Sequence, residues 1–320
     1  MITAQGLKKT FRSRRGSVEA VRGVDLSVEA GGIVGFLGPN GAGKTTTLRM
    51  LTTLLEPTEG TATVAGFDLR ANPVGVRRSI GYVSQAGGSA PEALVGEELE
   101  YHARFYGLSR GDARRRSQDL LPQLDLAGLD TRQVKTLSGG QRRRLDIAMG
   151  LVHSPGLVFL DEPTTGLDPQ SRANMWEHIR RLRNNNGTTV FLTTHYLEEA
   201  DALCDRIFVI DAGLIVASGT ADELKQQVSG DLVQVEVASG TEGDIDKARG
   251  IAAGRPGAEQ LTVDGAVVSF RVSRGDEAVV GLLRDLDAAG IALSSLQVQR
   301  PTLDDVFLAL TGHALRDGSE

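Results

Sequence analysis

The chain has 320 residues, of which 40% are hydrophobic and 24% charged, with a formal net charge of −6. This length allows one sizeable core and a smaller second domain, and the acidic balance excludes the basic footprint of a nucleic-acid-binding protein. A single cysteine, Cys204, excludes an internal disulfide framework, and no run approaches the ~18 consecutive apolar residues that a membrane span needs.

Short apolar runs alternate with helical patterns over the first two thirds of the chain. This order indicates an α/β fold with a largely parallel sheet. Strands are predicted at 33–37, 79–83, 156–160, 188–193 and 206–211. Between about residues 92 and 154 the pattern is mostly helical, which predicts an all-helical insertion in the α/β core.

The pattern changes near residue 220, where a capped helix start at Asp222 opens a second domain. Its elements read β-α-β-β-α-β plus a final helix, which is typical of a small α+β sandwich of ferredoxin-like type. The predicted strands are 232–237, 260–263, 266–272 and 293–298, with helices from 243, over 277–289 and from 302. Leu303, Val306, Phe307 and Leu310 form an apolar stripe on the last helix, which favours a core or dimer contact.

The clearest chemical motif follows the strand at 33–37. It comprises Gly38, Pro39, Asn40, Gly41, Ala42, Gly43, Lys44, Thr45 and Thr46 and matches G-x-x-x-x-G-K-[ST] between a predicted strand and a predicted helix. Its glycines let successive N–H groups converge on phosphate oxygens, at which the next helix aims its positive dipole end. Lys44 can place its charge on the β- and γ-phosphates, and the Thr45 hydroxyl can bind Mg²⁺.

Two adjacent carboxylates end the strand at 156–160. Asp161 can hold Mg²⁺ through water, and Glu162 can orient and deprotonate an attacking water molecule. With the phosphate loop, these residues define a P-loop NTPase with a RecA-like core. GTPases, nucleotide kinases and RecA-like motors remain possible at this point, although the chain has no N-K-x-D guanine motif.

The pentapeptide 137–141, Leu-Ser-Gly-Gly-Gln, separates these candidates. It precedes a helical run, so it forms a helix N-terminus whose free N–H donors can bind an anion. It is the ABC signature, and together with loop 38–46, Asp161, Glu162 and His195 it makes residues 2 to 220 resemble ABC-transporter ATPase subunits. The resemblance implies a head-to-tail homodimer in which the signature of each copy contacts ATP held by the other, through Ser138, Gly139, Gly140 and Gln141.

Further roles carry over from this family one residue at a time. Gln85 resembles the Q-loop glutamine that approaches Mg²⁺, and Asp168 resembles the D-loop residue that contacts the opposite subunit. His195 resembles the switch histidine, which holds the γ-phosphate and acts in hydrolysis with Glu162 and Lys44. Phe11 stands where the family has an aromatic that stacks on adenine, and core packing is an equal interpretation. Arginines 142–144 could add positive potential near the site or form a solvated helix face.

The closer resemblance is to bacterial exporter ATPases of the daunorubicin/doxorubicin-resistance type, through residues 166–172, 197–201 and 300–312. It implies an ATPase domain over 1–220, with a helical subdomain at about 89–156, and an accessory, regulatory or dimerisation domain over 221–320. ATP and Mg²⁺ are the implied cofactors, and a separate transmembrane permease is the implied partner.

Efflux of a hydrophobic drug or antibiotic is the function that this resemblance implies. The N-terminus lacks the apolar segment of a signal peptide, so we expect a peripheral protein on the cytoplasmic face of the membrane, in contact with it only through the permease. Lipid or polysaccharide export is an alternative. A non-transport ABC ATPase is another, although the long coiled coil of repair ATPases and the second module of translation factors do not occur here.

Overall fold

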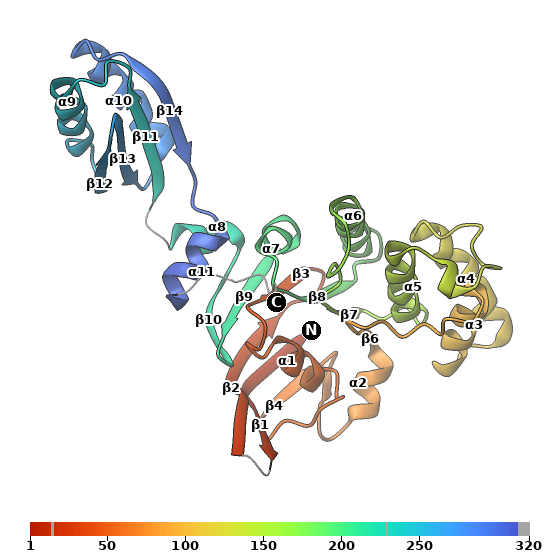
Figure 1. The fold of residues 1–320 in the computed structure, drawn as a ribbon. Helices are drawn as coiled ribbons and strands as arrows, with labels where there is room; N and C mark the ends of the chain where they lie inside the picture. The colour runs from red at the N-terminus through yellow and green to blue at the C-terminus, as the bar shows by residue number, and fades with distance from the viewer. Residues whose placement is uncertain (14–15, 228–229, 313–320) are drawn as a thin grey trace. The chain divides into compact units, whose positions relative to one another are not determined.

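The computed structural model describes residues 1–13, 16–227 and 230–312, and the chain divides into two compact units. The first unit runs from Met1 to Ala221 and the second begins at Asp222. Figure 1 shows the elements of each unit and their order along the chain.

A six-stranded sheet of order β10-β9-β3-β8-β7-β6 forms the centre of the first unit. The strands are β3 (Ile33–Leu37), β6 (Ile80–Val83), β7 (Leu157–Asp161), β8 (Thr189–Thr194), β9 (Arg206–Asp211) and β10 (Leu214–Gly219). All are parallel except β10, which pairs antiparallel with β9. Every residue of β3, β7 and β8 is buried, as expected of strands covered on both faces. The carboxyl ends of these three neighbours therefore meet at one edge of the sheet.

This sheet confirms the predicted parallel α/β core, with strand ends shifted by one residue in places. Ser79, for example, was predicted to start a strand but is the last residue of helix α2 (Pro73–Ser79), and β6 begins at Ile80. The other helices that flank the sheet are α1 (Lys44–Leu51), α6 (Pro169–Asn186) and α7 (Leu197–Leu203).

A second sheet of the first unit was not predicted. It has the order β2-β1-β4-β5, is antiparallel throughout, and comprises β1 (Ile2–Ser13), β2 (Gly16–Val28), β4 (Glu59–Val64) and β5 (Phe67–Asp68). Its buried side chains, such as Val24 and Leu26, share one core with Phe36 of β3 and Leu48 of α1. The β1–β2 ladder shifts register three times, which breaks the two-residue alternation by which a strand is recognised.

The predicted helical insertion is present between β6 and β7. It contains α3 (Val95–Phe105), α4 (Arg110–Gln123), the 3₁₀ turn Val134–Thr136 and α5 (Gly139–Leu151). Its core, with Leu99, Leu120 and Leu145, is continuous with Val158 and Leu160 of β7. Helix α5 therefore packs directly on the sheet.

The second unit confirms the β-α-β-β-α-β order. It contains β11 (Asp231–Val237), α9 (Glu242–Ala253), β12 (Glu259–Asp264), β13 (Val267–Val272), α10 (Gly275–Ala288) and β14 (Leu293–Gln299). The sheet order β12-β13-β11-β14, antiparallel throughout, is that of a ferredoxin-like sandwich. Alternate residues such as Val233, Val235 and Phe270 form its core with Leu282 of α10.

Two short helices flank this sandwich in sequence, α8 (Ala221–Gln226) and α11 (Leu303–Thr311). A capping box between Thr302 and Asp305 starts α11. The apolar stripe predicted there is buried at three of its four positions, whereas Leu310 is 38% exposed.

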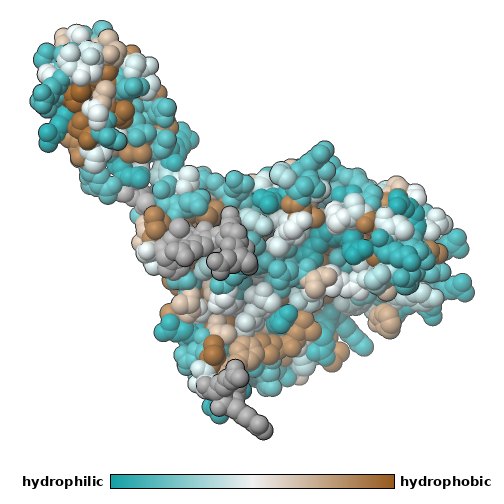
Figure 2. Space-filling view, viewed as in Figure 1, coloured by the Kyte–Doolittle hydropathy of each residue, from teal (hydrophilic) through white to brown (hydrophobic). Residues whose placement is uncertain are grey.

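The surface in view carries mostly hydrophilic residues, with apolar ones in small groups (Figure 2). Among the residues that the structure describes, no helix combines the length and the apolar character that crossing a membrane requires.

Candidate nucleotide-binding site

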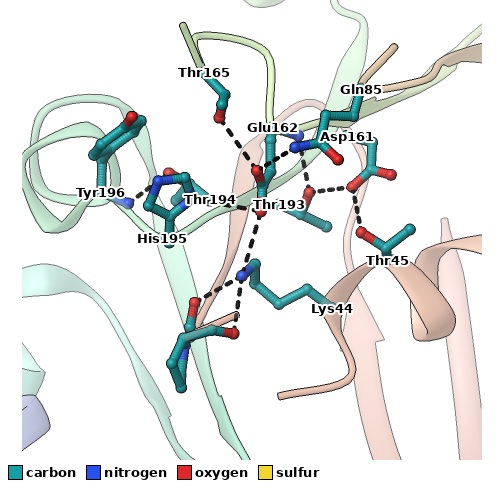
Figure 3. A network of polar contacts seen from close by, with 12 residues as sticks. Lys44, Thr45, Gln85, Asp161, Glu162, Thr165, Thr193, Thr194, His195 and Tyr196 are labelled. Carbon is teal, nitrogen blue, oxygen red and sulfur yellow. Dashed lines mark hydrogen bonds and ion pairs between the residues drawn. The ribbon is translucent and has the colours of Figure 1, made fainter. Parts of the chain in front are cut away.

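The phosphate loop joins β3 to α1 and folds around the Lys44 side chain. The Lys44 Nζ donates hydrogen bonds to the carbonyls of Gly38 at 2.8 Å and Pro39 at 3.1 Å (Figure 3). Gly43 has a φ of +105°, and a Cβ on Gly38 would lie 2.2 Å from the Ile210 carbonyl oxygen. Glycine is therefore required at both ends of the loop, once for backbone conformation and once for close approach.

Lys44 and Glu162 form a buried pair at the edge of the sheet. The Nζ of Lys44 lies 3.4 Å from Glu162 Oε1, and the two side chains are 4% and 7% exposed. Burial lowers the pKa of Lys44, and the Glu162 charge opposes that effect. A cation held this way, next to backbone N–H groups, is suited to receive an anion.

Glu162 is the centre of the polar network in Figure 3. Its Oε2 accepts hydrogen bonds from Gln85 Nε2 at 2.9 Å and from Thr165 Oγ1 at 3.2 Å. Its Oε1 lies 3.4 Å from His195 Nδ1 as well as from Lys44. Burial favours the neutral acid, but the interactions with His195 and Lys44 outweigh it and lower the Glu162 pKa to about 2. The carboxylate is therefore ionised at neutral pH.

Asp161 connects the phosphate loop to the neighbouring strand. Its Oδ1 accepts hydrogen bonds from Thr45 Oγ1 at 3.0 Å and Thr193 Oγ1 at 2.7 Å. The Thr193 hydroxyl also accepts one from the backbone N–H of Glu162 at 3.0 Å. The Thr193 hydroxyl therefore joins the Asp161 carboxylate to the backbone amide of Glu162.

The signature residues lie at the start of α5, where Ser138 is the N-cap. Ser138 Oγ accepts a hydrogen bond from the Gln141 N–H at 3.2 Å, and Gln141 Oε1 accepts one from the Ser138 N–H at 3.0 Å. This capping box leaves the N–H groups of Gly139 and Gly140 without an intrahelical partner, as at any helix start. Within residues 1–13, 16–227 and 230–312, no hydrogen bond or ion pair links these residues to the Lys44–Glu162 network.

Two further predicted residues also lie outside that network. Asp168 is the N-cap of α6, where it accepts hydrogen bonds from Ser171 N at 2.9 Å and Ser171 Oγ at 2.6 Å. Phe11 is 44% exposed, with Lys9 Nζ 5.5 Å from its ring centroid. This exposure excludes core packing for Phe11 and leaves part of its ring accessible for stacking.

Two polar residues of the site were missed by sequence reasoning. Thr193 was seen only as a strand end, although a hydroxyl at the carboxyl end of a buried strand is a signal for such a role. Arg143 was interpreted with its neighbours as a solvated face or a source of positive potential. The solvated face is wrong for Arg143, because it is 8% exposed and all its hydrogen bonds go to backbone carbonyls. Two of these carbonyls belong to Asp161 and Glu162, so its positive charge does lie near the site.

Comparison with known proteins assigns both units. Residues 21–165 match the ABC transporter family, and residues 219–311 match the C-terminal domain of DrrA1-3-like ATP-binding proteins. The daunorubicin resistance ATP-binding protein DrrA3 of Streptomyces coeruleorubidus is 44% identical over 97% of this chain and 96% of its own length. The doxorubicin resistance ATP-binding protein DrrA of Mycobacterium tuberculosis is 43% identical over 97% and 93%.

A solved structure is also similar, a dimeric post-hydrolysis ATP-binding cassette with ADP and phosphate bound. It has a TM-score of 0.63 and 26% identity, over 69% of this chain and 98% of that one. The chain therefore belongs to the ATP-binding proteins of the ABC transporter family, and among them to the group with a DrrA-like C-terminal domain. It is an ATPase of the ABC type.

Proposed function

We propose that this chain is the ATPase of an exporter that expels a hydrophobic, drug-like compound through a separate permease. The observation that carries this proposal is the C-terminal match at 219–311, combined with relatives that align over nearly the whole chain. The names of those relatives concern resistance to daunorubicin and doxorubicin.

In the proposed mechanism, ATP binds with its phosphates in the loop 38–46 and its adenine against Phe11. Phosphate oxygens compete with Glu162 for the Lys44 ammonium, which lies 3.4 Å from the carboxylate in the structure described above. Losing that contact raises the pKa of Glu162 from about 2 towards the range in which a general base works. Nucleotide binding itself would thus prepare the base.

The residues present fit Mg²⁺. The Thr45 hydroxyl and the Asp161 carboxylate offer oxygen ligands 3.0 Å apart, and the Gln85 amide nitrogen lies 2.9 Å from Glu162 Oε2. No cluster of three or more His, Cys, Asp or Glu forms a metal cage in the described part of the chain, which suits an ion bound mainly by phosphates and water. When bound, Mg²⁺ neutralises charge on the phosphate oxygens. Thr45, Asp161 and Gln85 would hold it.

For hydrolysis, we assign Glu162 to orient and deprotonate the attacking water. His195, 3.4 Å from the same carboxylate, would contact the γ-phosphate and position that water. A positioned general base contributes about 10²–10⁴ in rate. Lys44 would stabilise the charge that develops on the transferred group.

We further propose a head-to-tail homodimer. The signature residues make no contact with the Lys44 network of their own copy within the described residues, and their free N–H groups suit a phosphate. A second copy could supply them, with Asp168 beside that interface. The similar cassette of known structure is described as dimeric.

The permease would dock on a groove of the first unit. This groove has a volume of about 780 Å³ and is lined by Val74, Arg77, Arg78, Phe105, Tyr106, Gly107, Leu108 and His153. Phe105 is 87% exposed and Val74 49%, so the groove offers apolar side chains that a partner surface could cover. Phe105→Ser should release the permease without changing ATP binding by the isolated chain.

A deletion strain tests the export function. Its sensitivity to a panel of hydrophobic antibiotics should rise several-fold for at least one compound, return to normal with the wild-type chain, and remain high with Glu162→Gln. Copurification from detergent should yield a multi-span membrane protein. Unchanged sensitivity together with loss of an envelope lipid or polysaccharide would move the assignment to lipid or polysaccharide export. Copurification of a soluble assembly alone would favour a non-transport ATPase.

A further inference from the structure

A buried arginine joins the signature helix to both catalytic carboxylate residues. Arg143 lies one turn into α5 and is 8% exposed. Its Nε donates to the carbonyl of Pro163 at 3.0 Å, and its Nη2 donates to the carbonyls of Asp161 at 2.8 Å and Glu162 at 3.3 Å. One edge of the guanidinium therefore holds three consecutive peptide groups at the end of β7.

The other edge of the same guanidinium holds the loop that carries Gln85. Its Nη1 donates to the carbonyl of Ser84 at 2.5 Å and to that of Gln85 at 3.4 Å. The far end of this loop is held from the next turn of α5 by Asp146, which is 7% exposed. Asp146 Oδ1 accepts hydrogen bonds from Gly88 N at 3.1 Å and Ser89 N at 3.3 Å.

The loop also fits Asp146 closely. Gly87 has a φ of +75°, and a Cβ there would lie 2.6 Å from Asp146 Oδ2. Residues 84–89 are thus fixed at both ends by two buried charged side chains of one helix. This arrangement accounts for the position from which Gln85 Nε2 reaches Glu162 Oε2 at 2.9 Å.

The backbone that Arg143 holds is strained. Glu162 has a φ of +45°, in the left-handed region that side chains other than glycine rarely adopt. Such a conformation persists only where the surroundings fix it. Arginine suits this task because its planar guanidinium presents five donors in a fixed fork and can bridge two segments at once, whereas a lysine places three donors at one point.

We propose that Arg143 and Asp146 are positioning residues for ATP hydrolysis. They set the Glu162 carboxylate and the Gln85 amide relative to each other, and they tie both to the helix whose first residues bind the nucleotide of the partner subunit. Movement of the signature end is thereby transmitted to the catalytic carboxylate of the same copy. The proposal rests on the proposed function, through the roles of Glu162 and the signature.

The test is Arg143→Met, with Arg116→Met as the matched control. Arg116 also donates only to backbone carbonyls of this helical region, those of Leu151 at 2.9 Å and Val152 at 3.3 Å, but at the opposite end of α5. Both variants lose an arginine–carbonyl tie and should lose some stability. Only Arg143→Met should lower kcat, by about 10- to 100-fold, as the loss of an outer-shell positioning group does.

ATP affinity separates positioning from a general structural defect. Arg143 has no hydrogen bond to the loop 38–46 among the described residues, so the Kd of Arg143→Met for ATP should stay within about twofold of wild type. Arg143→Lys keeps the charge and one set of contacts, so its kcat should lie between those of wild type and Arg143→Met. If Arg143→Met does not fold, the kcat of Arg143→Lys tests the proposal in its place.

A double variant gives the decisive comparison. If Arg143 acts through Glu162, adding Arg143→Met to Glu162→Gln should lower turnover by less than about twofold further, because interacting sites are not additive. A kcat for Arg143→Met equal to that of Arg116→Met, or full additivity with Glu162→Gln, would overturn the inference. Normal turnover in Glu162→Gln alone would instead overturn the proposed function.

Discussion

Lys44 Nζ and Glu162 Oε1 lie 3.4 Å apart with both side chains almost fully buried, so the phosphate loop and the strand-end carboxylate neutralise each other when no anion is bound. The Lys44 ammonium group can therefore pair either with the Glu162 carboxylate or with a bound phosphate. It also makes the behaviour of either residue informative about the other.

Removing Lys44 should abolish nucleotide binding. Lys44→Ala takes away the one cation of the described phosphate loop and leaves Glu162 buried with fewer partners, so we expect ATP affinity to fall at least about 100-fold. Isothermal titration calorimetry on the isolated chain measures this. Lys247→Ala, which removes a lysine whose side chain is 62% exposed in the second unit, serves as a charge-matched control that should bind ATP nearly normally. Undiminished affinity in Lys44→Ala would refute the phosphate assignment.

Acid should weaken the fold through Glu162. Its pKa in the folded chain is about 2, below the usual 4.5, so the unfolded state binds more protons between these values. The stabilising contribution of Glu162 is therefore complete above about pH 4.5 and is lost as the pH falls towards 2. Urea unfolding at pH 6, 4 and 3 should show the stability difference between wild type and Glu162→Gln shrinking as the pH falls. A difference that stays constant over this range contradicts the lowered pKa.

Removing the Thr193 hydroxyl should raise the Mg²⁺ requirement of ATP hydrolysis. Thr193→Val keeps the shape but removes the hydroxyl that donates to Asp161 at 2.7 Å and accepts from Glu162 N at 3.0 Å. We expect a higher Mg²⁺ concentration for half-maximal ATPase activity and a stability loss of about 1–3 kcal/mol. Thr193→Ser, which restores the hydroxyl, should recover most of the activity. Equal Mg²⁺ dependence in Thr193→Val and wild type would exclude the role.

The sequence predicted those parts of the site that depend on local chain order. Asp161 is the last residue of β7, Glu162 and His195 directly follow β7 and β8, and parallel strands bring such positions to one edge of the sheet. Lys44 and Thr45 begin helix α1, at the end of the loop that follows β3. Motif and strand together were therefore enough to expect them side by side, and Figure 3 shows all five in one network. The distances and hydrogen-bond partners within that network could not be predicted from the sequence, because they depend on how the strands and the loop pack.

Arg143 could not be predicted in the same way, because its partners are backbone carbonyls from two distant segments. A run of three arginines on a helix does not indicate which one is buried, since only the packing of α5 on the sheet decides it. The antiparallel sheet near the N-terminus was not predicted, for a different reason. Register shifts between β1 and β2 interrupt the alternation of apolar residues.

The central claim is that one ATP is held between two copies of this chain. A crystal or cryo-EM structure of Glu162→Gln with ATP and Mg²⁺ tests it most directly, since that variant should bind ATP but hydrolyse it about 10²–10⁴ times more slowly. We expect a closed dimer in which the γ-phosphate contacts Lys44 of one copy and Ser138 of the partner subunit. A nucleotide enclosed wholly within a single copy, with its own Ser138 on the phosphate, would contradict the account.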